Sequence, residues 1–369
     1  MHVVVAGGGS AGHIEPALAF ADALRRRDPD AQITALGTER GLDTRIIPAR
    51  GYDLALIPPV PIPRRPGTDL LRVPGRLKAA VDAAADVLRA QSADVVVGFG
   101  GFVSGPAYLA ARRLGVPIVV HEANPRPGWA NRLGARLTPY VAFTFPGTPI
   151  AHGRQIGLPI RRAITTLDRA ARREEARSTF GLVADLPTLL VTGGSQGAKR
   201  LNDATSGAAV DLRAAGVQVL HATGTAHTVD VPAAGPGDPP YVTVPYLDRM
   251  ELGYAAADLV LCRAGANTVV ELTVVGLPAA YVPLPIGNGE QALNARPVVD
   301  AGGGLMVDDA DCTPDWVRTV LTPLLTDPVR LAAMGLAAAT SGRPDADERL
   351  VDLALEAAGQ AAARGGRRW

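Results

Sequence analysis

A histidine directly behind a glycine-rich turn is the first side chain of the sequence that could do chemistry. The turn reads Gly7-Gly-Gly-Ser-Ala-Gly12, and His13 follows it at the start of a predicted helix. Backbone N–H groups and the positive helix end attract phosphate at such a turn, and the same positive end lowers the pKa of a histidine. A neutral imidazole there can take a proton from a hydroxyl group, so His13 is the candidate general base.

The glycine spacing also fits the fingerprint of dinucleotide-binding enzymes, whose next strand ends in an acid that binds the ribose hydroxyls. Here the next strand ends at Gly37, and Glu39 lies two residues beyond it in a loop. Because the acid is missing and a histidine stands behind the last glycine, we expect the turn to bind a substrate phosphate. No NAD, flavin or other cofactor is expected.

Two turns of the second half suggest the same chemistry. Gly193-Gly-Ser-Gln-Gly197 follows a strand and precedes a helix, and Arg263-Ala-Gly-Ala-Asn-Thr268 does so again. Both could bind phosphate through backbone N–H groups, although a tight turn without a ligand has the same composition. Glu271 lies one turn into the second helix, where it could hold a ribose diol or serve as a capping or solvent-facing carboxylate.

Other motifs have a structural interpretation beside a functional one. His121 ends a predicted buried strand, where a hydrogen-bonded structural histidine is favoured over a catalytic base. The glycine-rich segment 98–105 indicates either close approach of backbone to a ligand or a plain turn. Two acidic pairs, 309–311 and 345–347, imitate those that hold a metal-bound sugar nucleotide in some enzymes. The first precedes Thr313-Pro314, a typical helix start, so we expect solvated carboxylates and no metal.

Composition limits the classes of protein. A chain of 369 residues is long for one core and predicts two domains. The formal net charge of +1, with 37 basic and 36 acidic residues, provides no general attraction to nucleic acid. The two cysteines, Cys262 and Cys312, fit a reducing compartment. No signal peptide or membrane-spanning run is recognisable, so we expect a cytoplasmic location.

Strand and helix patterns alternate in both halves, which is typical of parallel sheets covered by helices. In the first half, strands are predicted at 3–6, 32–36, 95–97, 118–120 and 140–144, and helices at 13–27, 74–90, 105–114 and 127–136, with a short unit at 42–57. After a break near 157–161, strands follow near 188–192, 217–221, 241–244, 259–261 and 279–282, and helices near 203–214, 248–256, 266–275, 291–301, 314–325 and 345–360. We expect residues 364–369 to be a disordered tail.

The segment from Pro58 to Lys78 combines prolines and leucines with several arginines. A basic and apolar loop of this kind can sit on an anionic membrane surface, and the competing interpretation is a structured crossover that caps the sheet. The candidate membrane contacts are Arg64, Arg65, Leu70, Leu71, Arg72 and Arg76.

Taken in order, these motifs resemble those of the MurG-type N-acetylglucosaminyltransferases of glycosyltransferase family 28. The resemblance covers nearly the whole chain and rests on Gly7-Gly-Gly-Ser-Ala-Gly-His13-Ile-x-Pro16, Gly100-Gly-Phe-Val-Ser-Gly105-Pro, His121-Glu-x-Asn124, Gly193-Gly-Ser-Gln-Gly197-Ala, Asn202, Arg263-x-Gly-Ala266 with Glu271, and Gln291-x-x-Asn294-Ala. The chain departs from the family at Ser10 and Ala11, where Thr and Gly are common, and at Gly289-Glu290.

The resemblance implies a GT-B fold, with two doubly wound Rossmann-like domains facing a cleft. The first domain, 1–160 plus 345–369, would bind the acceptor lipid I on the membrane side, and the second, 161–344, would bind UDP-GlcNAc. The implied reaction is metal-independent, inverting transfer of GlcNAc to the MurNAc 4-hydroxyl, which gives lipid II for peptidoglycan. It would take place at the cytoplasmic face of the membrane, with an anionic membrane surface and other cell-wall synthesis proteins as partners.

The same resemblance implies roles for single residues. In the second domain, Ser195, Gln196 and Thr268 would bind the diphosphate, Glu271 the ribose, backbone near Leu247 the uracil, and Gln291 the sugar, with Arg161, Asn202, Ala266 and Asn294 lining the donor site. In the first domain, Ser10, Ala11, Gly12 and Asn124 would face the diphosphate and sugar of the acceptor, beside the catalytic His13.

Three other functions compete with this interpretation. A UDP-GlcNAc 2-epimerase, or a glycosyltransferase with a soluble acceptor, can share the architecture, and membrane association that depends on the loop 58–78 would distinguish the lipid acceptor from both. A non-catalytic partner that recruits a synthase would not need the set His13, Ser195, Glu271 and Gln291 in one chain.

Overall fold

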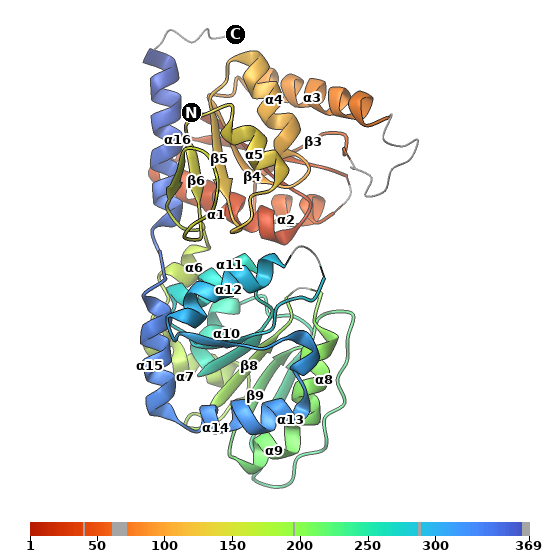
Figure 1. The fold of residues 1–369 in the computed structure, drawn as a ribbon, viewed down its shortest axis with the longest axis vertical. Coiled ribbons are helices and arrows are strands. Elements are labelled where there is room, and N and C mark those ends of the chain that lie inside the picture. Colours follow the sequence, from red (N-terminus) through yellow and green to blue (C-terminus); the bar gives the residue numbers. More distant parts are fainter. Residues whose placement is uncertain (40, 61–71, 195, 287–288, 364–369) are drawn as a thin grey trace. The chain divides into compact units, whose positions relative to one another are not determined.

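The computed structural model describes residues 1–39, 41–60, 72–194, 196–286 and 289–363 and consists of two compact units. The first comprises Met1–Arg161 and the chain from Pro344 onward, and the second comprises Arg162–Arg343. Each is built on its own parallel sheet with helices packed against it (Figure 1). Two such Rossmann-like domains constitute the GT-B fold, so the predicted fold class is confirmed. The predicted disordered tail, 364–369, lies outside the described residues.

The first unit has a seven-stranded sheet in the order β3-β2-β1-β4-β5-β6-β7, with all neighbouring strands parallel. Its strands are β1 (His2–Gly7), β2 (Gln32–Gly37), β3 (Asp53–Leu56), β4 (Val95–Gly100), β5 (Ile118–Glu122), β6 (Val141–Phe143) and β7 (Gly153–Gln155). Its helices are α1 (Ala11–Arg27), α2 (Asp43–Ala49), α3 (Val73–Ala90), α4 (Ser104–Leu114), α5 (Trp129–Ala135) and α16 (Ala346–Ala363).

Strand β1 shows why a central strand of this sheet is apolar. Val3 and Val5 pack in one cluster with α1 and α16, whereas Val4 and Ala6 pack in the other with α3 and α4. A strand buried on both faces has no polar side, so it reads as a continuous apolar run. Helix α16 lies beside α1 (Figure 1), and an ion pair of 2.7 Å between Arg26 and Asp347 joins the two helices.

The second unit repeats this architecture with six parallel strands in the order β10-β9-β8-β11-β12-β13. Its strands are β8 (Thr188–Thr192), β9 (Gln218–Ala222), β10 (Tyr241–Val244), β11 (Leu259–Cys262), β12 (Ala279–Tyr281) and β13 (Gly304–Met306). Its helices are α6 (Arg162–Thr165), α7 (Arg169–Thr179), α8 (Lys199–Gly207), α9 (Ala209–Ala214), α10 (Met250–Ala256), α11 (Ala266–Val274), α12 (Glu290–Asp300), α13 (Pro314–Trp316), α14 (Thr322–Leu325) and α15 (Pro328–Ala339).

The strand order explains where each site must lie. In both sheets the chain reverses its direction of winding beside the first strand, between β1 and β4 and between β8 and β11. At such a switch point the following loops run to opposite faces and leave a crevice at the carboxyl ends of the strands. The glycine loops after β1 and β4, and the turns after β8 and β11, are the segments at these two switch points.

The elements differ from the sequence prediction in several places. The predicted helix 203–214 is two helices, α8 and α9, which meet at Ala208 directly after a glycine. The predicted helix 314–325 contains a π-helical turn, Val317–Leu321, ahead of Pro323, a residue that has no N–H to donate. Strands β7 and β13 were not predicted, because strands of three residues carry too little pattern. Helix α15 was not predicted either.

Across the described part of the chain, no single helix is both long and apolar enough to cross a membrane. One bent pair, Pro314–Leu325 with Pro328–Ala339, passes this test by length and composition alone.

Candidate active site

The first glycine loop packs closely against the loop that follows β4. A Cβ atom on Gly101 would lie 2.4 Å from the carbonyl oxygen of Gly8, and Gly101 has a φ of +78°, which L side chains rarely adopt. A Cβ on Gly100 would meet the His13 ring at 3.3 Å. Gly100 and Gly101 are therefore required by the close packing of this loop on the first glycine loop and the candidate base, whereas Gly98 and Gly105 leave room for Tyr108 and Trp129.

His13 lies in the first turn of α1 and is half-buried. Its Nδ1 atom is 3.0 Å from the hydroxyl of Ser10, the exposed N-cap residue of the same helix. The pKa of His13 lies below the usual histidine value, as predicted, but the main cause is desolvation by burial, and the carboxylate of Asp43 opposes it. The imidazole is neutral near pH 7 and can accept a proton.

Asp43, the first residue of α2, is an acidic residue that the sequence analysis missed. Its side chain is fully buried, and its carboxylate accepts hydrogen bonds from the backbone N–H of Gly9 at 2.7 Å and of Thr38 at 2.9 Å. The acid absent from the end of β2 is thus found in the next helix, and it binds the protein's own glycine loop. The fingerprint places the acid at the end of the second strand, at Gly37, so the search ended before it reached Asp43 in the following helix.

The loop after β5 is held by a second buried carboxylate. Glu122 accepts hydrogen bonds from the backbone N–H of Asn124 at 2.9 Å and of Gly128 at 3.0 Å, and from the side chain of Asn131 at 2.9 Å. Tyr108 in turn donates to the Asn131 carbonyl at 2.9 Å. These bonds leave the Asn124 side chain half-buried on a fixed loop, and its contact with an acceptor stays a prediction.

His121 is the structural histidine that the sequence favoured. It is fully buried, and its Nε2 donates to the carbonyl of Gly157 at 2.8 Å. Burial lowers the pKa of His121 to about 4.

In the second unit, the glycine loop after β8 packs on the chain after β9. A Cβ on Gly197 would lie 2.2 Å from the carbonyl oxygen of Thr223, so a larger residue would push the two loops apart. Gln196 is exposed on this loop, ahead of the first turn of α8. Ser195, the other predicted diphosphate contact here, lies outside the described residues.

Asn202, predicted to line the donor site, points into the domain. It is 3% exposed, its amide N–H donates to Thr223 at 3.0 Å, and its carbonyl lies 3.0 Å from Nε2 of His221. His221 also contacts the Tyr241 hydroxyl at 2.8 Å, and burial lowers the His221 pKa to about 4. These contacts give Asn202 a role in fixing the loop; its direct contact with the donor stays a prediction.

The turn after β11 is held by an ion pair that corrects one expectation. Asp309, predicted to be a solvated carboxylate at a helix start, lies 2.6 Å from Nη1 of Arg263, and the two side chains are only 18% and 14% exposed. The same guanidinium donates to the carbonyl of Val282 at 3.1 Å. Asp309 was placed wrongly because sequence distance concealed its partner. Thr313 does cap α13, since its side chain accepts from the N–H of Trp316 at 3.2 Å.

Glu271 is not solvent-facing. Its side chain is half-buried and accepts a 2.7 Å hydrogen bond from the hydroxyl of Tyr254, a buried residue that the sequence did not single out. Thr268 and Ala266 lie in the first turn of α11 and are half-buried, so the helix end, Thr268 and Glu271 belong to one short segment. Binding of the ribose and diphosphate there stays a prediction.

The remaining predicted donor contacts are placed as follows. The side-chain oxygen of Gln291 accepts from the backbone N–H of Leu284 at 2.9 Å. Asn294 is buried and donates to the carbonyl of Ala264 at 3.0 Å, which ties α12 to the turn after β11. The Leu247 side chain is buried, and Arg161 is half-buried at the last residue before the second unit.

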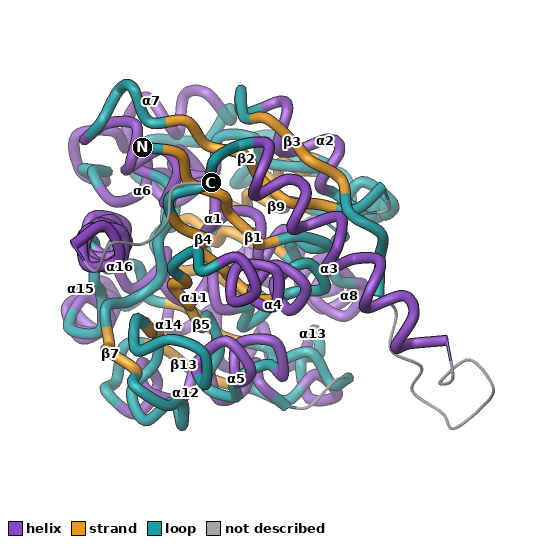
Figure 2. Tube along the Cα trace, turned by 90° about the horizontal axis from the view of Figure 1, so that it is seen from above, coloured by secondary structure: helices purple, strands orange, loops and turns teal. Residues whose placement is uncertain are grey.

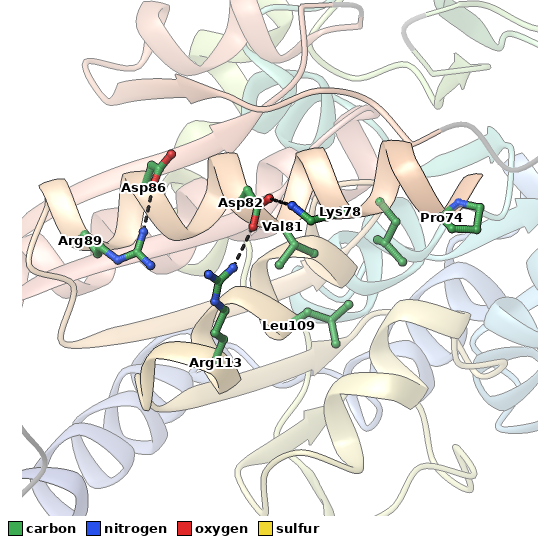
Figure 3. A pocket seen from close by; sticks show the side chains of 9 residues that line it. Pro74, Lys78, Val81, Asp82, Asp86, Arg89, Leu109 and Arg113 are labelled. Atoms are coloured by element: carbon green, nitrogen blue, oxygen red, sulfur yellow. Dashed lines mark hydrogen bonds and ion pairs between the residues drawn. The ribbon is translucent and has the colours of Figure 1, made fainter. Parts of the chain in front are cut away.

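Most of the predicted membrane loop lies outside the described residues, including Arg64, Arg65, Leu70 and Leu71. Arg72 and Arg76 are described at the start of α3. Helix α3 lies alongside α4 (Figure 2), and a groove of about 640 Å³ is lined by both helices. Figure 3 shows Pro74, Val81 and Leu109 on this groove, next to the ion pairs of Asp82 with Lys78 and Arg113, both 2.7 Å.

Among the described residues, no group of three or more His, Cys, Asp or Glu side chains could hold a metal ion. Metal independence stays a prediction.

Comparison with known proteins gives the family. Residues 3–142 match the glycosyltransferase family 28 N-terminal domain, and residues 188–350 match the family's C-terminal domain. A UDP-N-acetylglucosamine--N-acetylmuramyl-(pentapeptide) pyrophosphoryl-undecaprenol N-acetylglucosamine transferase of Streptomyces avermitilis is 62% identical over 357 residues, which covers 97% of this chain and 98% of the relative.

Two solved structures are similar over almost the whole chain. The crystal structure of Acinetobacter baumannii MurG matches with a TM-score of 0.77 and 30% identity, and covers 96% of this chain and 99% of its own. A UDP-GlcNAc 2-epimerase from Neisseria meningitidis bound to UDP-GlcNAc has a TM-score of 0.66 at 14% identity, over 96% of this chain and 100% of its own, and shares the fold only. The chain is a glycosyltransferase of family 28, and it belongs within that family to the MurG-type N-acetylglucosamine transferases.

Proposed function

We propose that this protein transfers GlcNAc from UDP-GlcNAc, with inversion, to the MurNAc 4-hydroxyl of undecaprenyl-pyrophosphoryl-MurNAc-pentapeptide (lipid I), and so makes lipid II. The observation that carries the proposal is 62% identity, over 97% of the chain, to a transferase named for this donor and acceptor. The buried carboxylates of Asp43 and Glu122 in the first unit, and the close-packed glycines at both switch points, support it, because they indicate binding loops of fixed shape rather than plain turns.

On the acceptor side, His13 removes the proton of the attacking hydroxyl. Its neutral imidazole and its position behind the glycine loop support this role, since a general base must be unprotonated and close to the hydroxyl. The Ser10 hydroxyl, 3.0 Å from Nδ1, orients the ring so that the other nitrogen serves the substrate. Ala11, Gly12 and Asn124 contact the acceptor diphosphate and sugar.

On the donor side, UDP leaves as its diphosphate takes up negative charge. The amino-terminal ends of α8 and α11 stabilise that charge with their free N–H groups and positive dipole ends, assisted by Ser195, Gln196 and Thr268. Glu271 binds the ribose hydroxyls, and Gln291 reads the sugar. Arg161, Asn202, Ala266 and Asn294 complete the donor site, and backbone near Leu247 binds uracil. No metal is required for this departure.

The protein works at the cytoplasmic face of the cell membrane as a peripheral protein. The arginines and leucines of 64–76, with the basic residues Lys78, Arg89 and Arg113 of the groove between α3 and α4, form its contact with an anionic surface (Figure 3). Such a contact brings the enzyme to an acceptor that is itself anchored in lipid. Other cell-wall synthesis proteins are further partners in this proposal.

The test is an assay of the purified protein with UDP-GlcNAc and a lipid I analogue, with EDTA in half of the reactions, in which UDP and the disaccharide are both measured. We expect UDP release that depends on acceptor, resists EDTA and yields a β-linked product. Loss of release with EDTA would contradict metal independence, and an α-linked product would contradict inversion.

Three further measurements separate the rival functions: a reaction without acceptor, a reaction with a lipid-free acceptor, and binding of UDP-GlcNAc. Conversion of UDP-GlcNAc to UDP-ManNAc would indicate the epimerase, and equal rates with a lipid-free acceptor would indicate a transferase with a soluble acceptor. Absence of any UDP-GlcNAc binding would indicate a non-catalytic partner.

A further inference from the structure

The carboxylate of Asp43 joins three separate segments of the first unit. One oxygen accepts from the N–H of Gly9 in the glycine loop at 2.7 Å, and the other accepts from the N–H of Thr38 after β2 at 2.9 Å. The Thr38 hydroxyl donates to the second oxygen at 3.3 Å, and Asp43 itself begins α2. The side chain is 0% exposed, so none of these bonds is shared with bulk water.

The surrounding backbone is shaped to this carboxylate. A Cβ atom on Gly37 would lie 2.9 Å from the Asp43 Cβ, and a Cβ on Gly8 would lie 3.2 Å from its carboxylate. Both neighbouring glycines therefore leave room for the Asp43 side chain. A buried carboxylate is costly unless it is fully hydrogen-bonded, so this arrangement requires the loop to keep its present course.

The held segment leads directly to the candidate base. Gly9 precedes Ser10, whose hydroxyl is 3.0 Å from His13, so a shift of Gly9 moves the hydroxyl that orients the ring. Asp43 on α2 is the charged group that acts on the imidazole among the described residues. The other neighbours of the ring, the Ser10 hydroxyl and the backbone of Gly100 and Gly101, are neutral.

We propose that Asp43 is a positioning residue for the acceptor half of the reaction, which holds the first glycine loop in register and, through Gly9 and Ser10, fixes the ring of His13. The inference rests on the proposed role of His13. The inference also indicates which donors of the loop are available to the substrate. Because the Gly9 N–H is bonded to Asp43, an acceptor diphosphate takes its hydrogen bonds from the first N–H groups of α1.

The charge has a defined effect on pH dependence. A nearby carboxylate favours the imidazolium form and raises the pKa of His13 against the lowering caused by burial. When the carboxylate is removed, the pKa falls further, and the base stays neutral down to lower pH. The acid limb of the rate profile must then move to lower pH, whereas simple damage to the fold would scale the rate equally at every pH.

The experiment compares Asp43→Asn with the wild-type protein in the lipid I analogue assay across pH. We expect kcat to fall roughly 10- to 100-fold, as displaced catalytic groups commonly cause, with the acid limb moved to lower pH and the Kd for UDP-GlcNAc unchanged. An unchanged kcat, or a fall in kcat with no movement of the limb, would overturn the proposal. Asp43→Glu restores the charge, so its limb should return to the wild-type pH.

Ile47→Val is the matched control. Ile47 is 2% exposed on the same helix, one turn after Asp43, and packs in the hydrophobic core of the first unit. It should lower Tm and leave kcat and the acid limb unchanged. If Asp43→Asn does not fold, Asp43→Glu is tested alone. Because this variant keeps the charge, a reduced kcat with the acid limb of the rate profile at the wild-type pH supports the proposal. An acid limb at a different pH contradicts it.

A double variant separates this inference from the proposed function. If Asp43 acts through His13, then His13→Ala with Asp43→Asn should be no slower than His13→Ala alone, because the positioned group is already gone. Full activity of His13→Ala would refute the base and not the transferase. An inactive His13→Ala, together with Asp43→Asn that behaves as wild type, would refute the role of Asp43 alone.

Discussion

At the scale of single residues, the proposed general base His13 gives a kinetic prediction. We expect His13→Ala to lower kcat by roughly 10²- to 10⁴-fold, the usual contribution of a general base, with the Kd for UDP-GlcNAc unchanged. In the wild-type protein, the acid limb of kcat/KM should lie below pH 6.5, because burial disfavours the charged imidazolium and lowers the pKa from that ordinary value. Both are measured with the lipid I analogue.

His152 supplies the control for that measurement. It is an exposed histidine of the same unit with a φ of 60°, a conformation that Asn tolerates, so His152→Asn should leave kcat and the pH profile as they are. An acid limb at or above pH 6.5, or one that survives in His13→Ala, would show that another group limits the rate at low pH.

At the scale of elements, α7 shows how a highly charged helix is fastened to a sheet. Arg177 has only 2% of its side chain exposed and donates to Asp258 at 2.9 Å, and the same carboxylate accepts from the N–H of Thr188 at 2.8 Å. Arg169 donates to the carbonyls of Tyr254, Ala257 and Gly276, at 3.1, 2.7 and 3.2 Å. These bonds tie α7 to the C-terminal ends of α10 and α11.

We therefore expect Asp258→Ala to destabilise the second unit by about 3–5 kcal/mol, because it leaves the buried Arg177 without its counter-charge. The measurement is urea denaturation followed by circular dichroism. Glu175→Ala is the control on the same helix, since its partner Arg172 is on the surface and the midpoint should stay in place. Equal midpoints for the two variants would mean that the Asp258 network contributes little.

At the scale of the whole molecule, a formal net charge of +1 means that attraction to a membrane must be local. We expect the protein to sediment with vesicles that contain phosphatidylglycerol and not with phosphatidylcholine alone, and salt to weaken the binding. Arg64→Glu together with Arg65→Glu should weaken it about 10-fold or more. Arg330→Glu, at an exposed site of the second unit, should not. Equal loss in all variants would indicate a diffuse charge effect.

Much of the fold could be predicted from the chain itself. Strands buried on both faces must be apolar along their length, so the run at Val3–Ala6 predicts a central parallel strand without any tertiary information. The Thr313-Pro314 pair predicts a helix start, because Thr is a good N-cap and Pro fits the first helical position, and α13 begins there. The short glycine motifs also identify the family from the sequence. The backbone geometry of such a turn depends on neighbouring residues, so the motif can be recognised without tertiary contacts.

Only the tertiary structure determines the partners of the buried charges. Asp43 reaches Gly9 because parallel pairing of β1 with β2 brings the two loop ends together, although 34 positions separate them in the chain. Arg263 meets Asp309, and Arg177 meets Asp258, at comparable or greater separations. A carboxylate looks solvated in any sequence window that lacks its partner, whereas burial and hydrogen bonding depend on contacts that only the folded chain makes.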